Sequence, residues 1–170
     1  MGGIKRQKKK YQTPKFAWSK SNLDAELRLL GAYGLRNKRE LYHHRSMLTK
    51  YRIFARKLLA RTSEDRLASE KQILNKLTSL KIIPEDSNLD NFLDLTIDKI
   101  LERRLQTLVF KKGLSQTLQQ ARQLITHGHI AIRGKKVTSP SYMVSSNEEQ
   151  EIRCTISHIL GEKEVVEEMN

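Results

Sequence analysis

Cysteine is almost absent from this sequence, which holds Cys154 as its single thiol among 170 residues. One thiol can form neither an internal disulfide nor a zinc cluster of several cysteines. The lack of disulfides is consistent with a protein that works in a reducing compartment. Long apolar runs are also lacking: none approaches the roughly 18 residues of a membrane span, and none of about seven to fifteen follows the basic start. We therefore expect a cytoplasmic protein without a membrane span or signal peptide.

Acidic residues are scarce in the first third of the chain. Residues 1–60 carry 16 lysines and arginines against three acids, Asp24, Glu26 and Glu40, whereas residues 61–170 carry 16 basic and 16 acidic residues. The net charge of +13 at pH 7 therefore arises entirely in the first 60 residues. Residues 99–136 add a second basic region, with nine cations and one acid. Two separate basic surfaces predict a polyanionic partner.

Signatures of catalysis and metal binding are missing as well. Residues 1–90 contain no glycine-rich phosphate loop, and their few acids before Glu64 are scattered. Catalysis needs side chains that converge in a cleft, and nothing in these residues predicts one. His127 and His129 bracket a glycine, but no third ligand lies near them in the sequence. The sequence therefore predicts no enzyme, no metal and no cofactor.

The chain's patterning predicts an α+β fold that begins with a mostly helical part. Residues 1–20 are basic and aperiodic, which predicts an extended arm that orders on its partner. Residues 21–93 are predicted to form a helical domain, with a first helix that starts at Asn22 and ends at the glycines of 31–34. Apolar spacing predicts two more helices, over 37–61 and about 64–80, before a polar connector at 84–91.

Residues 94–157 are predicted to form a small module of two helices and a β-hairpin. Helical spacing runs from Ile97 to Leu105, and Thr117 with Gln120 has the form of a capping box that starts the next helix. The pattern then alternates, which predicts a hairpin with Gly134 and Lys135 at its turn. Further short strands are expected around 142–144 and 152–156. An acidic tail is expected over 158–170.

The helix predicted at 37–61 carries cations on a face separate from its apolar stripe. Lys38, Arg45, Arg52 and Arg56 recur at spacings of seven, seven and four, with Glu40 as the only acid among them. A charged helix face is most often merely solvated. Without acids to screen it, however, such a face repels itself, and contact with phosphates is the favoured interpretation.

Several blocks in fixed order resemble the S-four RNA-binding module. They are RRLQT at 103–107, QARQLI at 120–125, HGHI at 127–130, GKKV at 134–137 and PSY at 140–142. YGLRNKREL at 33–41 and LLAR at 58–61 resemble the helical domain of small-subunit ribosomal protein S-four, in its shorter archaeal and eukaryotic style. The resemblance spans nearly the whole chain. Bacterial relatives often hold a cysteine zinc cluster near the N-terminus, which this sequence cannot form.

The resemblance implies a structural constituent of the small ribosomal subunit. Such a protein is a primary binder of 16S-type ribosomal RNA that organises a multi-helix junction in assembly, near the channel by which messenger RNA enters, and influences translational accuracy. The implied partners are ribosomal RNA, neighbouring small-subunit proteins and messenger RNA, and not a membrane or a second copy of the chain. The basic and polar residues expected to contact RNA are Lys5, Arg6, Lys8, Lys9, Lys10, Lys38, Arg39, Arg45, Arg52, Arg56, Arg103, Arg104, Thr107, Lys111, Lys112, Arg122, Gln123, His127, His129, Arg133, Lys135 and Lys136.

Two alternatives share parts of this architecture. A ribosome-assembly factor with the same domains would bind precursor ribosomal RNA instead. S-four modules are also appended to RNA-modifying enzymes and tyrosyl-tRNA synthetases, but those need a catalytic domain larger than the helical segment here. Guanidinium groups offer planar forks for phosphate, and double-stranded RNA is recognised mainly through shape, phosphates and 2′-hydroxyls. The basic module therefore favours RNA binding over catalysis.

Overall fold

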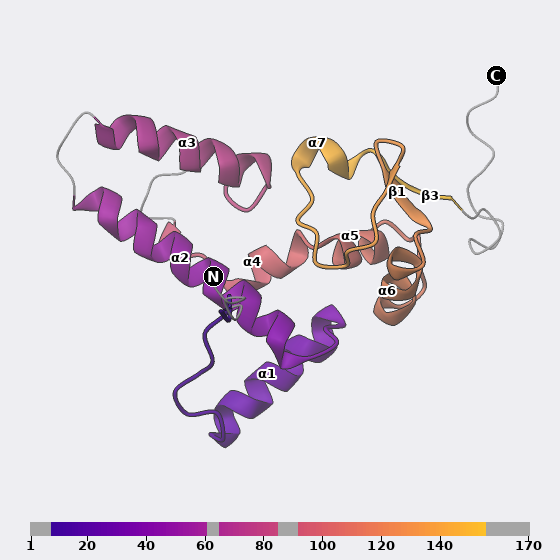
Figure 1. Ribbon diagram of the computed structural model, residues 1–170, viewed down its shortest axis with the longest axis horizontal. Helices are drawn as coiled ribbons and strands as arrows, with labels where there is room; N and C mark the ends of the chain where they lie inside the picture. Colours follow the sequence, from indigo (N-terminus) through magenta and orange to yellow (C-terminus); the bar gives the residue numbers. More distant parts are fainter. Residues whose placement is uncertain (1–7, 61–64, 85–91, 156–170) are drawn as a thin grey trace, which may run out of the picture. The chain divides into compact units, whose positions relative to one another are not determined.

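The computed structural model describes residues 8–60, 65–84 and 92–155, which form two compact units (Figure 1). The first unit comprises the described residues up to 75 together with 92–101, and the second comprises 76–84 with 102–155. Helices and a small antiparallel sheet confirm the predicted α+β class. Lys5, Arg6, Ile156, most of the connector at 84–91 and the acidic tail at 158–170 lie outside the described residues.

The first unit is helical, as the periodicity predicted. It contains α1 (Lys20–Tyr33) and α2 (Lys38–Leu59), while α3 (Asp65–Ser79) and α4 (Ile97–Glu102) each begin in it and end in the second unit. Gly34 ends α1 in the left-handed conformation, with φ of 58°. The chain then enters α2, which contacts α1 and runs at an angle to it (Figure 1). Leu35, Leu41 and Leu101 form a buried cluster with Leu29, Leu30, Tyr33 and Ile97 packed against it.

Leu23, Leu27 and Leu30 recur at helical spacing in the sequence, but the buried face of α1 is not this leucine stripe alone. Leu27 is exposed, whereas Glu26 is the one residue of α1 that is fully buried, with 1% of its surface exposed. The face toward α2 therefore includes a carboxylate, which Tyr42 and two cations of α2 surround. The helix is anchored by an ionic contact as well as by apolar packing.

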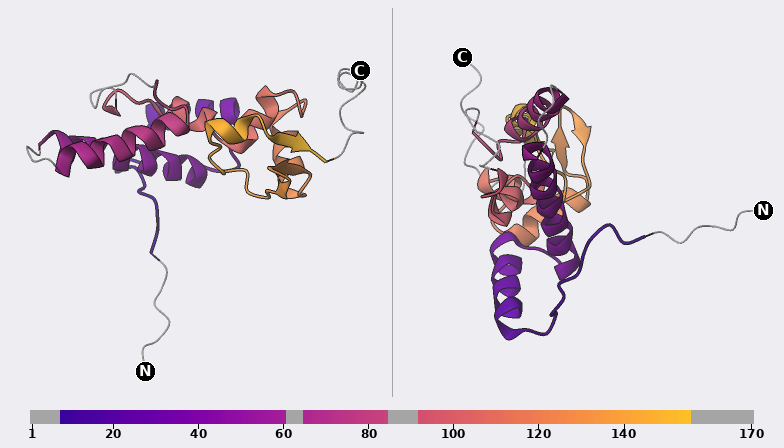
Figure 2. Two further views of the ribbon diagram at one scale, coloured as in Figure 1. Left: turned by 90° about the horizontal axis from the view of Figure 1, so that it is seen from above. Right: turned by 90° about the vertical axis from the view of Figure 1, so that its left-hand side faces the viewer.

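Residues 8–19 run without helix or strand and contact α2 before they reach the start of α1 (Figure 2). The Tyr11 ring stacks on Tyr42, with centroids 6.4 Å apart, and also lies 5.8 Å from the His43 ring. The backbone N–H of Gln12 donates a hydrogen bond to Ser46 Oγ at 2.9 Å. These contacts fix the middle of the predicted arm on α2.

The second unit packs two helices against a three-stranded sheet. α5 (Leu105–Lys111) and α6 (Leu118–Thr126) precede β1 (Ile130–Ile132), β2 (Lys135–Lys136) and β3 (Ile152–Cys154). The antiparallel strands lie in the order β2-β1-β3, and Figure 1 shows β1 beside β3. One core joins both layers: Leu105, Leu108, Val109, Ala121, Leu124, Ile125, Ile130, Ile132, Val144 and Ile152.

The prediction of one continuous helix from Ile97 to Leu105 is wrong, because the structure has two helices with a break between them. α4 ends at Glu102, Arg104 is extended with φ of −73° and ψ of 136°, and α5 begins at Leu105. The backbone here bonds to a later segment: Leu105 N–H donates to the Tyr142 carbonyl at 2.8 Å, and Val144 N–H to the Arg103 carbonyl at 3.0 Å. These long-range bonds replace the helical ones.

The start of α6 agrees with half of the predicted capping box. Thr117 accepts a hydrogen bond from Gln120 N–H at 3.1 Å, as expected of an N-cap. The Gln120 side chain, however, accepts from Gln116 N–H at 2.7 Å and not from Thr117 N–H. Gly128 follows the helix with φ of 75°, a left-handed conformation that glycine adopts without strain.

The hairpin is confirmed, with its turn one residue earlier than expected. Ile132 pairs with Lys135, so Arg133 and Gly134 form the two-residue turn and Lys135 already belongs to β2. Both turn residues have positive φ, 52° and 72°, as tight hairpin turns require.

A strand was expected around 142–144, and the structure corrects this. Met143 makes only an isolated bridge to Arg104, and a short helix follows, α7 (Ser146–Glu149). The N–H of Ser145 donates to Glu148 Oε2 at 3.0 Å and stabilises the start of α7. The strand expected from residue 152 is confirmed as β3.

No helix within the described ranges has the length and apolar character needed to cross a membrane.

Candidate nucleic-acid interface

In the first unit, two of the predicted phosphate-binding cations on α2 pair with a carboxylate of α1. Lys38 Nζ lies 3.2 Å from Glu26 Oε2, and Arg45 Nη1 lies 3.1 Å from Glu26 Oε1. The Tyr42 hydroxyl donates to the same carboxylate at 3.2 Å. Burial chiefly, with the neighbouring carboxylate, raises the pKa of Tyr42. Part of the basic face therefore contributes to the contact between α1 and α2.

Arg52, the next cation along this face, is engaged within the unit as well. Its Nη2 donates a hydrogen bond of 2.6 Å to the Leu95 carbonyl, which fixes residues near the start of α4 to α2. Arg56 Nε donates to the Arg52 carbonyl one turn earlier, but the Arg56 side chain is exposed. The structure thus divides the predicted face: Lys38, Arg45 and Arg52 make internal contacts, and Arg56 remains at the surface.

The remaining cations of this unit whose burial the structure describes are solvent-exposed. Arg39 lies in the first turn of α2, and Lys8, Lys9 and Lys10 precede the docked part of the arm. Lys50 and Lys57 are also exposed on α2, although the spacing argument missed them. The sequence could have revealed their exposure, because helical spacing places both on the side of α2 opposite to the buried leucines. These exposed cations form the basic surface of the first unit.

In the second unit, three predicted RNA contacts lie in the interior. Arg104 is 0% exposed, and Arg103 and Thr107 are also buried. Arg103 Nη1 pairs with Glu149 Oε2 at 3.0 Å, and its Nη2 donates to the Val144 carbonyl at 3.1 Å. These positions follow from the helix break, because Arg103 and Arg104 lie between α4 and α5, where the backbone pairs with residues 142–144.

Glu149 joins three basic residues of the second unit. Besides Arg103, it accepts from Lys81 Nζ at 3.4 Å, and its backbone carbonyl accepts from Lys112 Nζ. Burial acts to raise the pKa of Glu149, but the hydrogen bond and charge of Arg103, with help from Lys81, hold that pKa below its ordinary value. The Glu149 carboxylate therefore stays ionised at neutral pH and fixes α7 to the helix break.

The lowered pKa of Glu149 predicts an acid-dependent loss of stability. A carboxylate whose pKa is lower in the folded chain stabilises the fold at pH values above its unfolded pKa, near 4.5, and this contribution disappears as pH falls through the folded pKa. Glu149→Gln should therefore lower the free energy of unfolding at pH 7 and reduce its decline below about pH 4.5. Urea titrations across this range measure both effects. An unchanged pH dependence in the variant would contradict the assignment.

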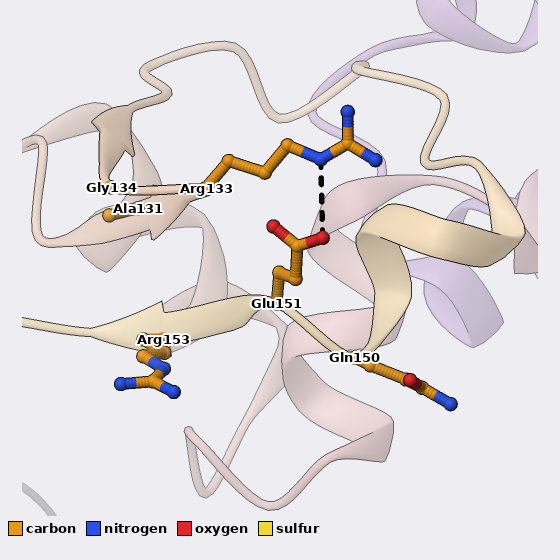
Figure 3. Close-up of a pocket in the computed structure, with 6 residues that line it drawn as sticks. All are labelled: Ala131, Arg133, Gly134, Gln150, Glu151 and Arg153. Carbon is orange, nitrogen blue, oxygen red and sulfur yellow. Dashed lines mark hydrogen bonds and ion pairs between the residues drawn. The ribbon is translucent and has the colours of Figure 1, made fainter.

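The hairpin and β3 carry four of the exposed cations of the second unit: Arg133, Lys135, Lys136 and Arg153. Arg133, at the turn, pairs through Nε with Glu151 Oε1 at 3.3 Å, and the two side chains point toward each other in Figure 3. Arg153 on β3 points away from this pair (Figure 3). Lys135, Lys136 and Arg153 are all exposed, and no carboxylate of the described residues forms an ion pair with them. A hollow of about 290 Å³ beside them is lined by Ala131, Arg133, Gly134, Gln150, Glu151 and Arg153.

The other predicted contacts of this unit lie on or near α5 and α6. Lys111 pairs with Glu102 at 3.5 Å, and both side chains are half exposed. Arg122 donates to Gln106 Oε1 at 3.4 Å. Gln123 and His127 are exposed, and the rings of His127 and His129 lie 6.0 Å apart. The structure thus brings Lys135 and Lys136 together on the hairpin, while Lys111 and Arg122 are partnered within the unit.

Besides Lys50 and Lys57, sequence reasoning missed two further residues that shape these surfaces, Arg153 and Glu26. Arg153 was not among the residues expected to contact RNA. A basic residue in a strand next to a basic hairpin could have been predicted to extend the same surface. Glu26 was treated as one scattered acid, although it lies three residues after Leu23 and four before Leu30, on the face that packs. Its helical spacing could have revealed its burial.

Among residues 8–60, 65–84 and 92–155, no group of three or more His, Cys, Asp or Glu side chains is arranged to hold a metal ion.

Comparison with known proteins identifies one domain family and a set of similar proteins. The S4 domain family matches residues 103–149, which cover α5 to α7. Small ribosomal subunit protein uS4 of Ignicoccus hospitalis is 49% identical over 150 residues, covering 88% of this chain and 90% of that protein. The proteins of the same name from Saccharolobus solfataricus and Hyperthermus butylicus are 51% and 50% identical, again over 88% of this chain, and the match covers 83% and 85% of their lengths. With about half of the aligned residues identical over 88% of its length, the chain belongs to the uS4 family of small ribosomal subunit proteins.

Proposed function

We propose that this protein binds ribosomal RNA as a structural component of the small ribosomal subunit, in the cytoplasm. The observation that carries the proposal is the cluster of exposed cations on the sheet of the second unit. Lys135 and Lys136 lie on β2 and Arg153 lies on β3, the two strands that flank β1, and Lys136 and Arg153 both pair with Ala131 of β1. None of the three forms an ion pair with a described carboxylate. Its relatives carry the name of a small-subunit ribosomal protein and not of an enzyme.

A rigid sheet suits the recognition of folded RNA. The hairpin is fixed by its antiparallel pairing to β3 and by a core that includes Ile130 and Ile132. Cations held at fixed spacing can match the phosphates of an RNA helix, which proteins recognise by shape because the major groove is too narrow for side chains. Counterion release from the phosphates then supplies much of the affinity and makes it salt-dependent.

The first unit offers a second basic surface. Arg39, Lys50, Arg56 and Lys57 are exposed on or at the ends of α2, and Lys8, Lys9 and Lys10 extend the charge along the arm. Two basic surfaces on one chain can neutralise phosphates from separate RNA segments. This arrangement supports the role of a primary RNA binder that holds a multi-helix junction of 16S-type ribosomal RNA during assembly.

Of the residues expected to contact RNA, we place the exposed ones in the interface and leave out those in the interior. Arg103, Arg104 and Thr107 support the module from within. Lys38, Arg45 and Arg52 act first in packing. We further propose, from the family, a position near the channel by which messenger RNA enters, contacts with neighbouring small-subunit proteins, an influence on translational accuracy, and no stand-alone homo-oligomer.

Sedimentation of cell extract tests the proposal. The protein, followed by antibody through a sucrose gradient, should travel with small subunits and translating ribosomes at moderate and at high salt. Presence on precursor particles alone would instead assign it to ribosome assembly. A pool that remains at the top of the gradient at both salt concentrations would overturn the proposal.

A further inference from the structure

The aromatic side chains of the N-terminal arm are used in two different ways. Tyr11 packs on Tyr42 and His43 and so serves the fold. Phe16 and Trp18, by contrast, are 69% and 90% exposed. Large aromatic side chains stabilise a protein most when they are buried. Two of them exposed within three residues therefore indicate a surface that a ligand covers.

These two rings border a shallow, open hollow of about 480 Å³. Its lining consists of Lys15, Phe16, Ala17, Trp18, Ser19 and Asn22. Lys15 Nζ lies 5.6 Å from the centre of the Phe16 ring, which places a positive charge at the same hollow. The site therefore combines flat apolar faces with a cation.

The segment that forms the hollow is held at both ends. At its start, the backbone N–H of Gln12 donates a hydrogen bond to Ser46 Oγ of α2. At its end, the chain enters α1 at Lys20. Figure 2 shows this segment spanning from α2 to the start of α1. Tethering at both ends lowers the entropy lost when a ligand orders the rings.

Charge selects the kind of ligand. Residues 8–23 contain five lysines and no acidic residue. A purely apolar patch would fit a protein neighbour, but aromatic rings interleaved with lysines match the chemistry of single-stranded nucleic acid, whose bases stack while its phosphates pair with cations. A base inside a duplex has no free face to offer.

We propose that Phe16 and Trp18 form a stacking site for an unpaired RNA base, with Lys15 and Lys20 available to the flanking phosphates. This inference rests on the proposed function, because it names which part of the RNA this segment takes: a bulged or looped nucleotide and not a helix. The hairpin cations of the second unit hold phosphates, whereas this site holds a base.

Trp18 is the only tryptophan of the chain, so its fluorescence reports on this site alone. The full-length protein is titrated with a short single-stranded oligoadenylate and with an RNA duplex of the same length. We expect the single strand to quench Trp18 fluorescence and to protect it from acrylamide, and the duplex to bind without either change. Equal quenching by both would overturn the proposal.

Two variants at Trp18 separate stacking from charge. Loss of a base stack worth about 1–3 kcal/mol makes Trp18→Ala bind the oligoadenylate about 5- to 150-fold more weakly, with the salt slope unchanged. Trp18→Phe should retain most of the affinity. Lys15→Ala is the charge control, and it should flatten the salt slope by about 0.7. Because Trp18 is exposed, its replacement should leave the circular dichroism spectrum and urea midpoint unaltered.

The outcomes also distinguish this inference from the function on which it rests. Salt-dependent RNA binding with unchanged Trp18 fluorescence, and equal affinity in Trp18→Ala, would overturn the stacking site and leave the function standing. Absence of binding to single strand, duplex and ribosomal RNA alike would overturn both. Protection of Trp18 by small-subunit proteins without RNA would assign the patch to a protein neighbour and overturn the stacking site.

Discussion

Replacing Lys135 and Lys136 together with alanine is expected to weaken binding to small-subunit ribosomal RNA by about 10- to 100-fold at moderate salt, because charge-assisted contacts are each worth roughly 1 kcal/mol or more. The slope of log affinity against log salt should fall by about 1.4 to 1.8, or 0.7 to 0.9 for each lost phosphate contact. Both side chains are exposed at the edge of the sheet. The free energy of unfolding should therefore stay within about 0.5 kcal/mol of the parent value.

A matched control is available on α3. Lys71 and Lys76 are exposed there, and replacing both removes the same charge and the same residue type. Filter binding across a series of salt concentrations compares the two double variants. If the α3 variant loses as much affinity and slope as the hairpin variant, only net charge matters, and the hairpin has no special part in the interface.

Replacing Glu26 with alanine is expected to lower the free energy of unfolding by about 3 kcal/mol, the lower end of the cost of removing one partner from a buried ion pair. The carboxylate is buried and holds Lys38, Arg45 and the Tyr42 hydroxyl. Both cations are partly exposed and can turn toward water, which keeps the loss from being larger. Glu26→Gln should cost less, because its amide oxygen still accepts from Tyr42. Urea unfolding measures all three proteins.

Asp24 provides the control on the same helix. It lies two residues before Glu26 and is exposed, so Asp24→Ala should change the free energy of unfolding by no more than about 0.5 kcal/mol. A loss as large as that of Glu26→Ala would mean that acidic charge on α1, and not the buried contact, stabilises the unit. RNA binding by folded Glu26→Ala adds a second readout: stronger binding would indicate that Lys38 and Arg45, once released, reach phosphates.

Features governed by neighbouring residues were predictable. The bounds of α2 followed from its apolar spacing, since Leu41, Leu48, Ala55 and Leu58 repeat on one side of a helix and are buried. The N-cap at Thr117 and the left-handed Gly128 are local backbone requirements. The hairpin followed from alternation next to a glycine, because the turn geometry limits which residues can occupy it.

Features governed by distant partners were not predictable in this way. The apolar spacing from Ile97 to Leu105 fits one helix, yet the backbone at Arg103 and Arg104 pairs with residues almost 40 positions later. The helix α7 was missed because Val144 alternates like a strand residue, while the Ser145 cap that starts the helix was overlooked. Leu27 fits the leucine pattern of α1, but α2 packs against the face that contains Glu26.

The amount and placement of positive charge, the α+β class and the family could all be inferred from the order of residues along the chain. Which cations remain available to a partner depends instead on contacts between residues far apart in that order. Arg45 and Arg103 lie about 3 Å from carboxylates 19 and 46 residues away, whereas Lys135 and Lys136 pair with no described acid. An ion pair requires approach to within 4 Å or so, and folding alone determines which distant residues come that close.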